Sequence, residues 1–144
     1  MELRIRSFAE LSNTELYEIL KARVDVFVVE QKCPYPEIDD IDYVAEHLFY
    51  CADDGKILAY LRAYWLEENI AKLGRVLTVN RGNGLGRAIL KEGIRYVREE
   101  MKAQKIVIEA QSYALGFYEK EGFEVISEEF LEDGIPHRKM ELVL

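Results

Sequence analysis

The spacing of apolar residues first alternates and then changes to steps of three and four. Leu3 and Ile5 alternate with charged neighbours, which predicts a strand that ends near Phe8. The sequence Ser12-Asn13-Thr14-Glu15 is a capping box, which is typical of the start of a helix. This helix should end near Glu30, and its predicted apolar face consists of Leu16, Leu20, Val24, Phe27 and Val28.

Three strand-like runs follow a predicted loop. Pro34 and Pro36 disfavour a helix, so the residues from Lys32 to Asp40 are predicted to form a loop. Two β-rich runs, from His47 to Ala52 and from Lys56 to Trp65, flank the hairpin signal Asp53-Asp54-Gly55. After a second turn at Glu67-Glu68-Asn69, a third strand runs from Leu73 to Val79.

The second half of the chain alternates helices and strands. The predicted elements are a helix from Gly84 to Met101, a buried strand from Lys105 to Gln111, a short helix from Tyr113 to Glu121 before Gly122, and strands from Phe123 to Phe130 and from Pro136 to Leu144. The order β-α-β-β-β-α-β-α-β-β predicts one α/β domain over residues 1–144. We expect a mixed (α+β) sheet with helices on both faces and a parallel crossover around the second helix.

Composition narrows the classes of function. The chain has 144 residues, of which 49% are hydrophobic, and a net charge of −8, which argues against nucleic acid as a partner. No apolar run approaches the roughly 20 residues of a membrane helix, and no signal-peptide pattern is present, so we expect a cytoplasmic protein without membrane contact. Neither Cys33 nor Cys51 belongs to a metal-binding pattern, so no metal is expected.

Charge is distributed unevenly along the sequence. The segment from Cys33 to Asp54 contains seven carboxylate residues and no Lys or Arg, whereas Arg75, Arg81, Arg87 and Lys91 surround a glycine-rich segment. The acidic segment is either a solvated surface or an attraction for a cation. The basic residues would attract a polyanionic ligand.

The glycine-rich segment lies between a predicted strand and a predicted helix. Glycines at positions 82, 84 and 86 allow a sharp turn and a close approach of the backbone to a ligand. Unpaired N–H groups at the start of a helix attract anions, and Arg81 and Arg87 can form forked bonds to phosphate. The segment therefore predicts a phosphate or pyrophosphate cradle, with a simple helix-starting turn as the alternative.

Three known phosphate-binding motifs can be compared with this segment, and only one of them matches it. A P-loop would require Gly-Lys-Ser/Thr, but Gly86 precedes Arg87-Ala88. The dinucleotide fingerprint fails because Arg87 or Ile89 occupies its third glycine position. The pattern Arg/Gln-x-x-Gly-x-Gly/Ala is matched by Arg81, Gly84 and Gly86.

The stretch LTVNRGNGLGRAIL resembles the cofactor motif of the GNAT superfamily of N-acetyltransferases. The later phrase ALGFYEKEGF resembles the second signature of that superfamily, a short helix that ends before Gly-Phe. Matches in order along nearly the whole chain are similar to the ElaA-like branch: VFVVEQ (26–31), CPY (33–35), GRV (74–76), AQ (110–111) and DGIPH (133–137). The resemblance implies the GNAT fold, with the sheet splayed between the strand from Leu73 to Val79 and the strand Lys105–Gln111.

The resemblance also implies acetyl-CoA as the donor of an acetyl group. The backbone of Leu77 and Val79 would bond the pantetheine amides, an N–H near Leu77 would polarise the acetyl carbonyl, and the N–H groups from Gly82 to Arg87 would hold the pyrophosphate. The full set of expected coenzyme A-binding residues is Leu77, Thr78, Val79, Arg81, Gly82, Asn83, Gly84, Leu85, Gly86, Arg87, Gln111, Phe117 and Tyr118.

Tyr118 matches the tyrosine that serves as general acid in many members, where it protonates the departing thiolate. From the residues alone, an aromatic packing role beside Phe117 is the alternative. The expected catalytic residues are Tyr118, Glu30 and His137. The general base that takes a proton from the amine is not assigned; the candidates are Glu30, Glu109, His47, His137 and water.

The expected acceptor is a primary amine on a small molecule or peptide. The acidic segment from Cys33 to Asp54 lies where members of the superfamily bind the acceptor, which favours a cationic one. The alternative function is an acyl-CoA-binding sensor without turnover. Edge strands near the C-terminus make a homodimer an expectation.

Overall fold

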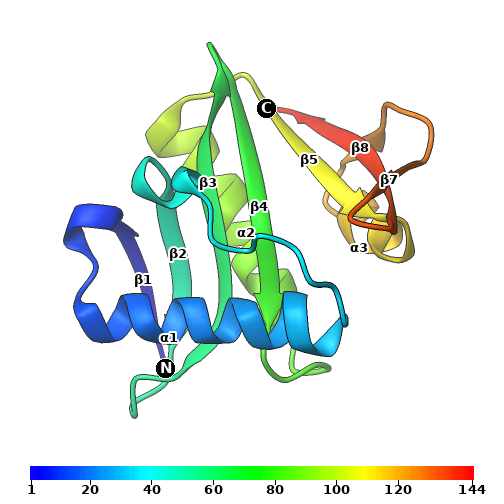
Figure 1. The fold of residues 1–144 in the computed structure, drawn as a ribbon. Helices are drawn as coiled ribbons and strands as arrows, with labels where there is room; N and C mark the ends of the chain where they lie inside the picture. The colour runs from blue at the N-terminus through cyan, green and yellow to red at the C-terminus, as the bar shows by residue number, and fades with distance from the viewer.

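The strands of the computed structural model, which describes residues 1–144, form one mixed sheet in the order β1-β2-β3-β4-β5-β8-β6, with β7 also paired to β8 (Figure 1). The strands are β1 (Glu2–Ser7), β2 (Glu46–Cys51), β3 (Ile57–Glu67), β4 (Ile70–Thr78), β5 (Lys105–Gln111), β6 (Glu124–Val125), β7 (Phe130–Glu132) and β8 (Ile135–Val143). β4 and β5 are parallel, and every other pair is antiparallel. The predicted mixed α/β sheet is therefore confirmed.

Helices cover both faces of the sheet (Figure 1). The helical elements are α1 (Asn13–Arg23), α2 (Leu85–Tyr96) and α3 (Leu115–Glu119), with π-helical continuations η2 (Val24–Glu30) and η4 (Val97–Met101) and short 3-10 turns η1 (Phe8–Glu10), η3 (Asp40–Tyr43) and η5 (Ser112–Ala114). We call the face under α1 the front face and the face under α2 and α3 the back face. A core of seven buried residues lies at the front, and one of sixteen at the back. None of the helices is both long and apolar enough to span a membrane.

Local sequence signals produce the expected turns and helix start. Ser12 caps α1 by accepting from the Glu15 N–H at 3.0 Å, and the Glu15 carboxylate accepts from the Ser12 N–H at 2.8 Å. Gly55 and Asn69 adopt the left-handed conformation in the two hairpin turns. The helix ends at Glu30 as predicted. Its fully buried residues are Ile19, Ala22 and Arg23, whereas the predicted face is half-buried, with Phe27 packed against the front core.

The strand predicted from Phe123 to Phe130 is two strands, and this prediction was wrong. β6 pairs with β8 at Val125 and Met140, whereas β7 pairs with the same strand at Phe130 and His137. The chain bulges between them because the Ser127 hydroxyl accepts the Lys139 N–H at 2.8 Å in place of a backbone carbonyl. The sheet consequently has eight strands instead of seven.

The parallel pairing of β4 with β5 is short. It joins Ile70 to Lys105, Ala71 to Ile106 and Lys72 to Val107, and then stops. Beyond Lys72 the strands separate, which agrees with the expected splay. β4 also contains a bulge at Arg75, which has a φ of 54°. The three-residue step from Gly74 to Leu77 on β4 lies opposite the two-residue step from Arg62 to Tyr60 on β3.

A network of three arginines and three carboxylates fixes the segment between η2 and β2 on the front face. We call the set Arg23, Arg62, Arg75, Glu37, Asp39 and Asp42 the ion-pair network. Arg23 donates to Glu37 and Asp42 at 2.8 and 2.7 Å, and Arg62 donates to Asp39 and Asp42. Arg75 reaches Glu37 at 3.0 Å. These charges are stabilising as a set, because each buried ion has partners.

We expect Asp42→Ala to destabilise the fold strongly. Asp42 is buried and accepts from both Arg23 and Arg62, so its loss leaves buried cationic groups under-paired. The free energy of unfolding should fall by about 3–5 kcal/mol in urea denaturation. Asp40→Ala is the matched control, because Asp40 is exposed in the same turn. It should stay within about 0.5 kcal/mol of the parent. Equal losses in the two variants would contradict a stabilising network.

Candidate functional site

The separation of β4 from β5 opens a cleft of about 710 Å³. It is lined by residues of both strands, the segment around residues 31–39, the start of the α3 region and the turn between β7 and β8. Of the expected site residues, those that line it are Gln111, Leu77, Thr78, Arg81, Gly86, Phe117, Tyr118, Glu109 and His137. Glu30, His47, Val79 and the loop residues Gly82, Asn83, Gly84, Leu85 and Arg87 do not.

The register of β4 decides which backbone groups face the cleft. The Val79 N–H donates to the Leu58 carbonyl of β3 at 3.0 Å. Along an antiparallel strand, the backbone N–H and C=O groups of every second residue point toward the same neighbouring strand. Leu77 lies two residues before Val79 and opposes Tyr60, so its backbone groups also point toward β3. The backbone N–H and C=O groups of Val76 and Thr78 therefore point toward the gap between β4 and β5. This differs by one residue from the expected use of Leu77 and Val79.

The glycine loop turns sharply at the start of α2 and leaves backbone N–H groups unpaired there. Gly82 and Gly84 have φ values of 82° and 78°, and a Cβ added at either would meet no atom within 4 Å. Asn83 accepts the Leu85 N–H at 3.1 Å, whereas the N–H groups of Gly86 and Arg87 make no hydrogen bond within the chain. The unpaired N–H groups and the helix dipole fit a phosphate or pyrophosphate.

Gly86 lets α2 approach the cleft closely. A Cβ added there would stand 3.2 Å from the Thr78 side chain and 3.7 Å from the Phe117 ring. The first turn of α2 is therefore in contact with both the end of β4 and α3. A pyrophosphate at this turn and a pantetheine arm along β4 are compatible with the same continuous groove.

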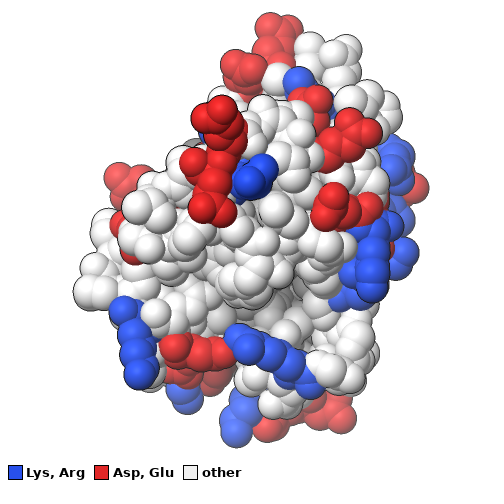
Figure 2. All heavy atoms as spheres, turned by 90° about the vertical axis from the view of Figure 1, so that its right-hand side faces the viewer, with Lys and Arg blue, Asp and Glu red and all other residues white.

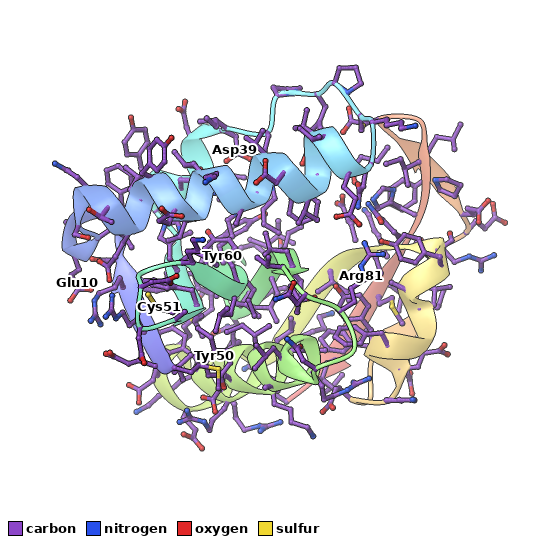
Figure 3. The ribbon with its side chains drawn as sticks, turned by 90° about the horizontal axis from the view of Figure 1, so that it is seen from below. Glu10, Asp39, Tyr50, Cys51, Tyr60 and Arg81 are labelled. Atoms are coloured by element: carbon purple, nitrogen blue, oxygen red, sulfur yellow. The ribbon has the colours of Figure 1, made fainter.

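The basic residues expected around the cradle are each paired with carboxylates. Arg81 pairs with Glu30 across the mouth of the cleft, and Figure 3 shows Arg81 reaching toward the end of the first helix. Arg87 donates to the Phe117 carbonyl and to Glu121, and Lys91 also pairs with Glu121. Arg75 belongs to the ion-pair network. Each of these cations therefore has a carboxylate partner within the chain.

The same network takes up part of the acidic segment that we expected to attract a cationic acceptor. Glu37 and Asp42 are buried, and together with Asp39 they neutralise arginines. Three of the seven carboxylates in the acidic segment are thus unavailable as free charge. Figure 2 shows acidic and basic side chains on one face separated by uncharged surface, so neither sign covers that face.

Tyr118 lines the back of the cleft. Its ring packs edge-on against Phe117 and Phe123, with centroids 5.1 and 5.8 Å away. Its hydroxyl makes no hydrogen bond within the chain, and burial raises the pKa of Tyr118 above its ordinary value. A phenol that is protonated at neutral pH and borders the cleft can donate a proton to a ligand.

The base candidates occupy different environments. His47 is buried between the Tyr60 hydroxyl at 2.6 Å and the Asp42 carbonyl at 3.0 Å, away from the cleft. Tyr60 lies between α1 and the strands (Figure 3). Burial lowers the pKa of His47, so it is a neutral, structural histidine. Glu30 is half-exposed and paired with Arg81. Glu109 and His137 line the cleft.

Glu132 was missed by the sequence reasoning. It lines the cleft at the end of β7, with its carboxylate 3.7 Å from the imidazole of His137 and near that of Glu109. Burial, together with Glu109, raises the pKa of Glu132. Nothing local in the sequence marks this residue, because both partners lie on other strands.

Two contacts bridge the front of the cleft. The amides of Gln31 and Gln111 bond to each other at 3.1 and 3.4 Å, and the Cys33 thiol contacts the Asp133 carbonyl at 3.5 Å. These bridges join the end of η2 to β5 and to the hairpin of β7 and β8. No group of three His, Cys, Asp or Glu residues is arranged to hold a metal ion.

Comparison with known proteins gives a consistent result. A family model described as an acetyltransferase (GNAT) domain matches residues 15–144. A UPF0039 protein of Schizosaccharomyces pombe is 39% identical, with 100% of this chain and 98% of that protein covered. Protein ElaA of Escherichia coli is 32% identical, with 90% of this chain and 88% of ElaA covered.

Solved structures agree with the sequence comparison. The crystal structure of an acyl-CoA N-acyltransferase from Pseudomonas aeruginosa superposes with a TM-score of 0.89 at 35% identity, covering 98% of this chain and 99% of the other. Escherichia coli ElaA superposes with a TM-score of 0.91 at 30% identity, with the same coverage.

We expect His47 to make the stability of the protein depend on pH. Because burial lowers its folded pKa, the unfolded chain binds more protons once the pH falls below about 6.5, and the folded state then loses stability. In His47→Gln, the decline in unfolding free energy between about pH 7 and pH 5 should be smaller than in the parent. Urea denaturation across this range measures both slopes. Identical slopes would show that His47 is not held neutral.

Proposed function

The chain belongs to the GNAT acetyltransferase family, in its ElaA-like branch, and we propose that it moves an acetyl group from acetyl-CoA to a primary amine. The observation that carries this proposal is the cleft between β4 and β5, which has the anion cradle at one end and Tyr118 on its back wall. A donor with phosphates at one end and a thioester at the other fits that arrangement.

The donor site is proposed to use backbone groups of two elements. Val76 and Thr78 would bond the pantetheine amides and polarise the acetyl carbonyl, because their backbone points into the gap. The N–H groups of Gly86 and Arg87 would hold the pyrophosphate. Arg81 is exposed and can exchange its partner Glu30 for a phosphate.

Tyr118 is proposed as the general acid. As the amine nitrogen forms its bond to the acetyl carbon and the carbon–sulfur bond breaks, Tyr118 would donate its proton to the departing sulfur. Its raised pKa keeps the hydroxyl protonated at neutral pH. The lack of a partner within the chain leaves this hydroxyl free to contact the donor.

The acceptor is proposed to be a compact primary amine that approaches from the front face. The Gln31–Gln111 and Cys33–Asp133 bridges narrow that side of the cleft. A small molecule or a flexible chain end fits such an opening better than a folded protein surface does.

Thiol release from acetyl-CoA across a panel of amines tests the proposal directly. Amine-dependent release together with an acetylated product supports acetyl transfer. Coenzyme A binding without turnover on any amine would instead favour an acyl-CoA sensor. If coenzyme A also failed to raise the melting temperature, the proposed donor site would be lost.

We expect Gly84→Ala to weaken coenzyme A binding. An added methyl group would strain the left-handed backbone and occupy the open side of the cradle. Calorimetry should show an affinity at least about tenfold lower, or about 1.4 kcal/mol. Gly55→Ala is the matched control, because Gly55 has a φ of 89° and an equally open surrounding in a distant turn. Both variants should lose about 1–2 kcal/mol of stability. Equal affinity in the two would contradict the cradle.

We expect Tyr118→Phe to reduce kcat while coenzyme A still binds normally. Loss of a general acid typically costs about 100-fold or more. Tyr96→Phe removes a hydroxyl from α2 outside the cleft and should leave kcat unchanged. Steady-state thiol release and calorimetry separate the two effects. A normal kcat in Tyr118→Phe would assign the ring to packing alone.

A further inference from the structure

A second group of ionisable residues lies at the front of the cleft, away from Tyr118. It comprises Lys72 on β4, Glu109 on β5, Glu132 at the end of β7 and His137 on β8, and all four line the cleft. We call these residues the front cluster. The donor cradle and Tyr118 use none of them.

The register of the sheet brings the front cluster together where the strands begin to separate. In β5, Ile106, Ile108 and Ala110 enter the back core, so Glu109 points to the front face. Glu109 comes two residues after Val107, the last residue paired with β4. On β8, His137 opposes Gln111 of β5 and Phe130 of β7, which places its side chain on the same face as that of Glu109.

The front cluster is on the side from which an amine would attack. Tyr118 packs against the back core, and the thioester would lie in the gap between β4 and β5. An acceptor that enters from the front therefore meets Glu109, Glu132 and His137 before it reaches the acetyl carbon. A group that takes a proton from the acceptor must lie on this side.

The two carboxyl groups are not equivalent. Burial opposes the ionisation of Glu109, but Lys72, which contacts it at 3.2 Å, and the neighbouring Glu132 carboxyl outweigh burial and lower the pKa of Glu109. Lys139 adds a further favourable charge. Burial, together with the neighbouring, negatively charged Glu109, raises the pKa of Glu132, and His137 only partly opposes this. Neighbouring carboxyl groups with opposite shifts often divide their roles in this way.

His137 is oriented by its own backbone. Its Nδ1 donates to the Ile135 carbonyl at 2.7 Å, which leaves Nε2 facing the Glu132 carboxylate at 3.7 Å. The ring also stacks on Phe130, with centroids 6.0 Å apart. His137 is thus held in one orientation, with its ring close to the Glu132 carboxylate at the cleft.

We propose that Glu132, positioned by Glu109 and His137, is the base that takes a proton from the acceptor ammonium. The inference rests on the proposed acetyl transfer. The ammonium loses one proton to the Glu132 carboxylate, and its lone pair forms the carbon–nitrogen bond as the carbon–sulfur bond breaks. The sulfur gains a proton from Tyr118, the nitrogen loses a second proton as the amide forms, and this second proton returns through water to the Tyr118 oxygen. Glu132 returns its proton to solvent.

We expect Glu132→Gln to lower kcat/KM with an alkyl amine by about 100-fold or more near neutral pH. The probe is the best primary alkylamine found in the thiol-release panel. Glu128→Gln is the matched control, because Glu128 is exposed on the same segment and does not line the cleft. It should behave as the parent. Coenzyme A should bind all three proteins alike.

The loss in Glu132→Gln should depend on the protonation of the acceptor. It should shrink as the pH approaches the pKa of the amine, and it should be small for an aniline, which is already neutral at pH 7. A structural defect would instead lower the rate at every pH and with every acceptor. A Glu132→Gln profile that matches that of Glu128→Gln throughout would overturn the proposal.

Glu109→Gln gives a second test that needs no acceptor. The negative charge of Glu109 raises the pKa of Glu132, so its removal should move the Glu132 carboxyl titration, followed by carbon-13 NMR, to lower pH. The acid limb of kcat/KM should move in the same direction. An unchanged Glu132 titration would overturn the proposed coupling even if the parent acetylated no amine. Absence of all turnover would by contrast count against the acetyl transfer itself.

Discussion

The short pairing of β4 with β5 is the constraint on which the rest of the site depends. Three residue pairs join the strands, and beyond Lys72 and Val107 each strand exposes backbone groups that a continuous sheet would have used. The bulge at Arg75 turns β4 at this point. The resulting cleft offers backbone donors and acceptors to a ligand that lies between β4 and β5 as an additional strand would.

The ion-pair network holds the front wall of this cleft. Arg23, Arg62 and Arg75 come from α1, β3 and β4, and their carboxylate partners all come from one segment without regular strand structure. A loop over a cleft has little apolar surface to bury, so charge pairs with several hydrogen bonds each fix its position. The side chain of Arg75 thereby couples the bulge in β4 to the acceptor side of the site.

The two faces of the sheet divide the proposed chemistry. On the back face, Tyr118 packs against two aromatic rings, and its burial keeps the hydroxyl protonated. On the front face, the carboxylates and Lys72 form a polar environment in which one carboxyl group binds a proton more tightly than the other. A thioester in the gap would meet a proton donor behind it and a proton acceptor in front.

The sequence by itself determined the family and most of the elements, including the glycine turn that we propose as the donor cradle. Helix caps, hairpin turns and glycine spacing depend on neighbouring residues, and such local signals predicted α1, the meander and the start of α2. Only the tertiary structure decided the partners of the charged side chains. Arg23, Arg75 and Arg87 each bind groups from distant segments, and Glu132 meets Glu109 and His137 across three strands. Register, burial and charge pairing depend on which strands become neighbours, and residue spacing along the chain does not encode that.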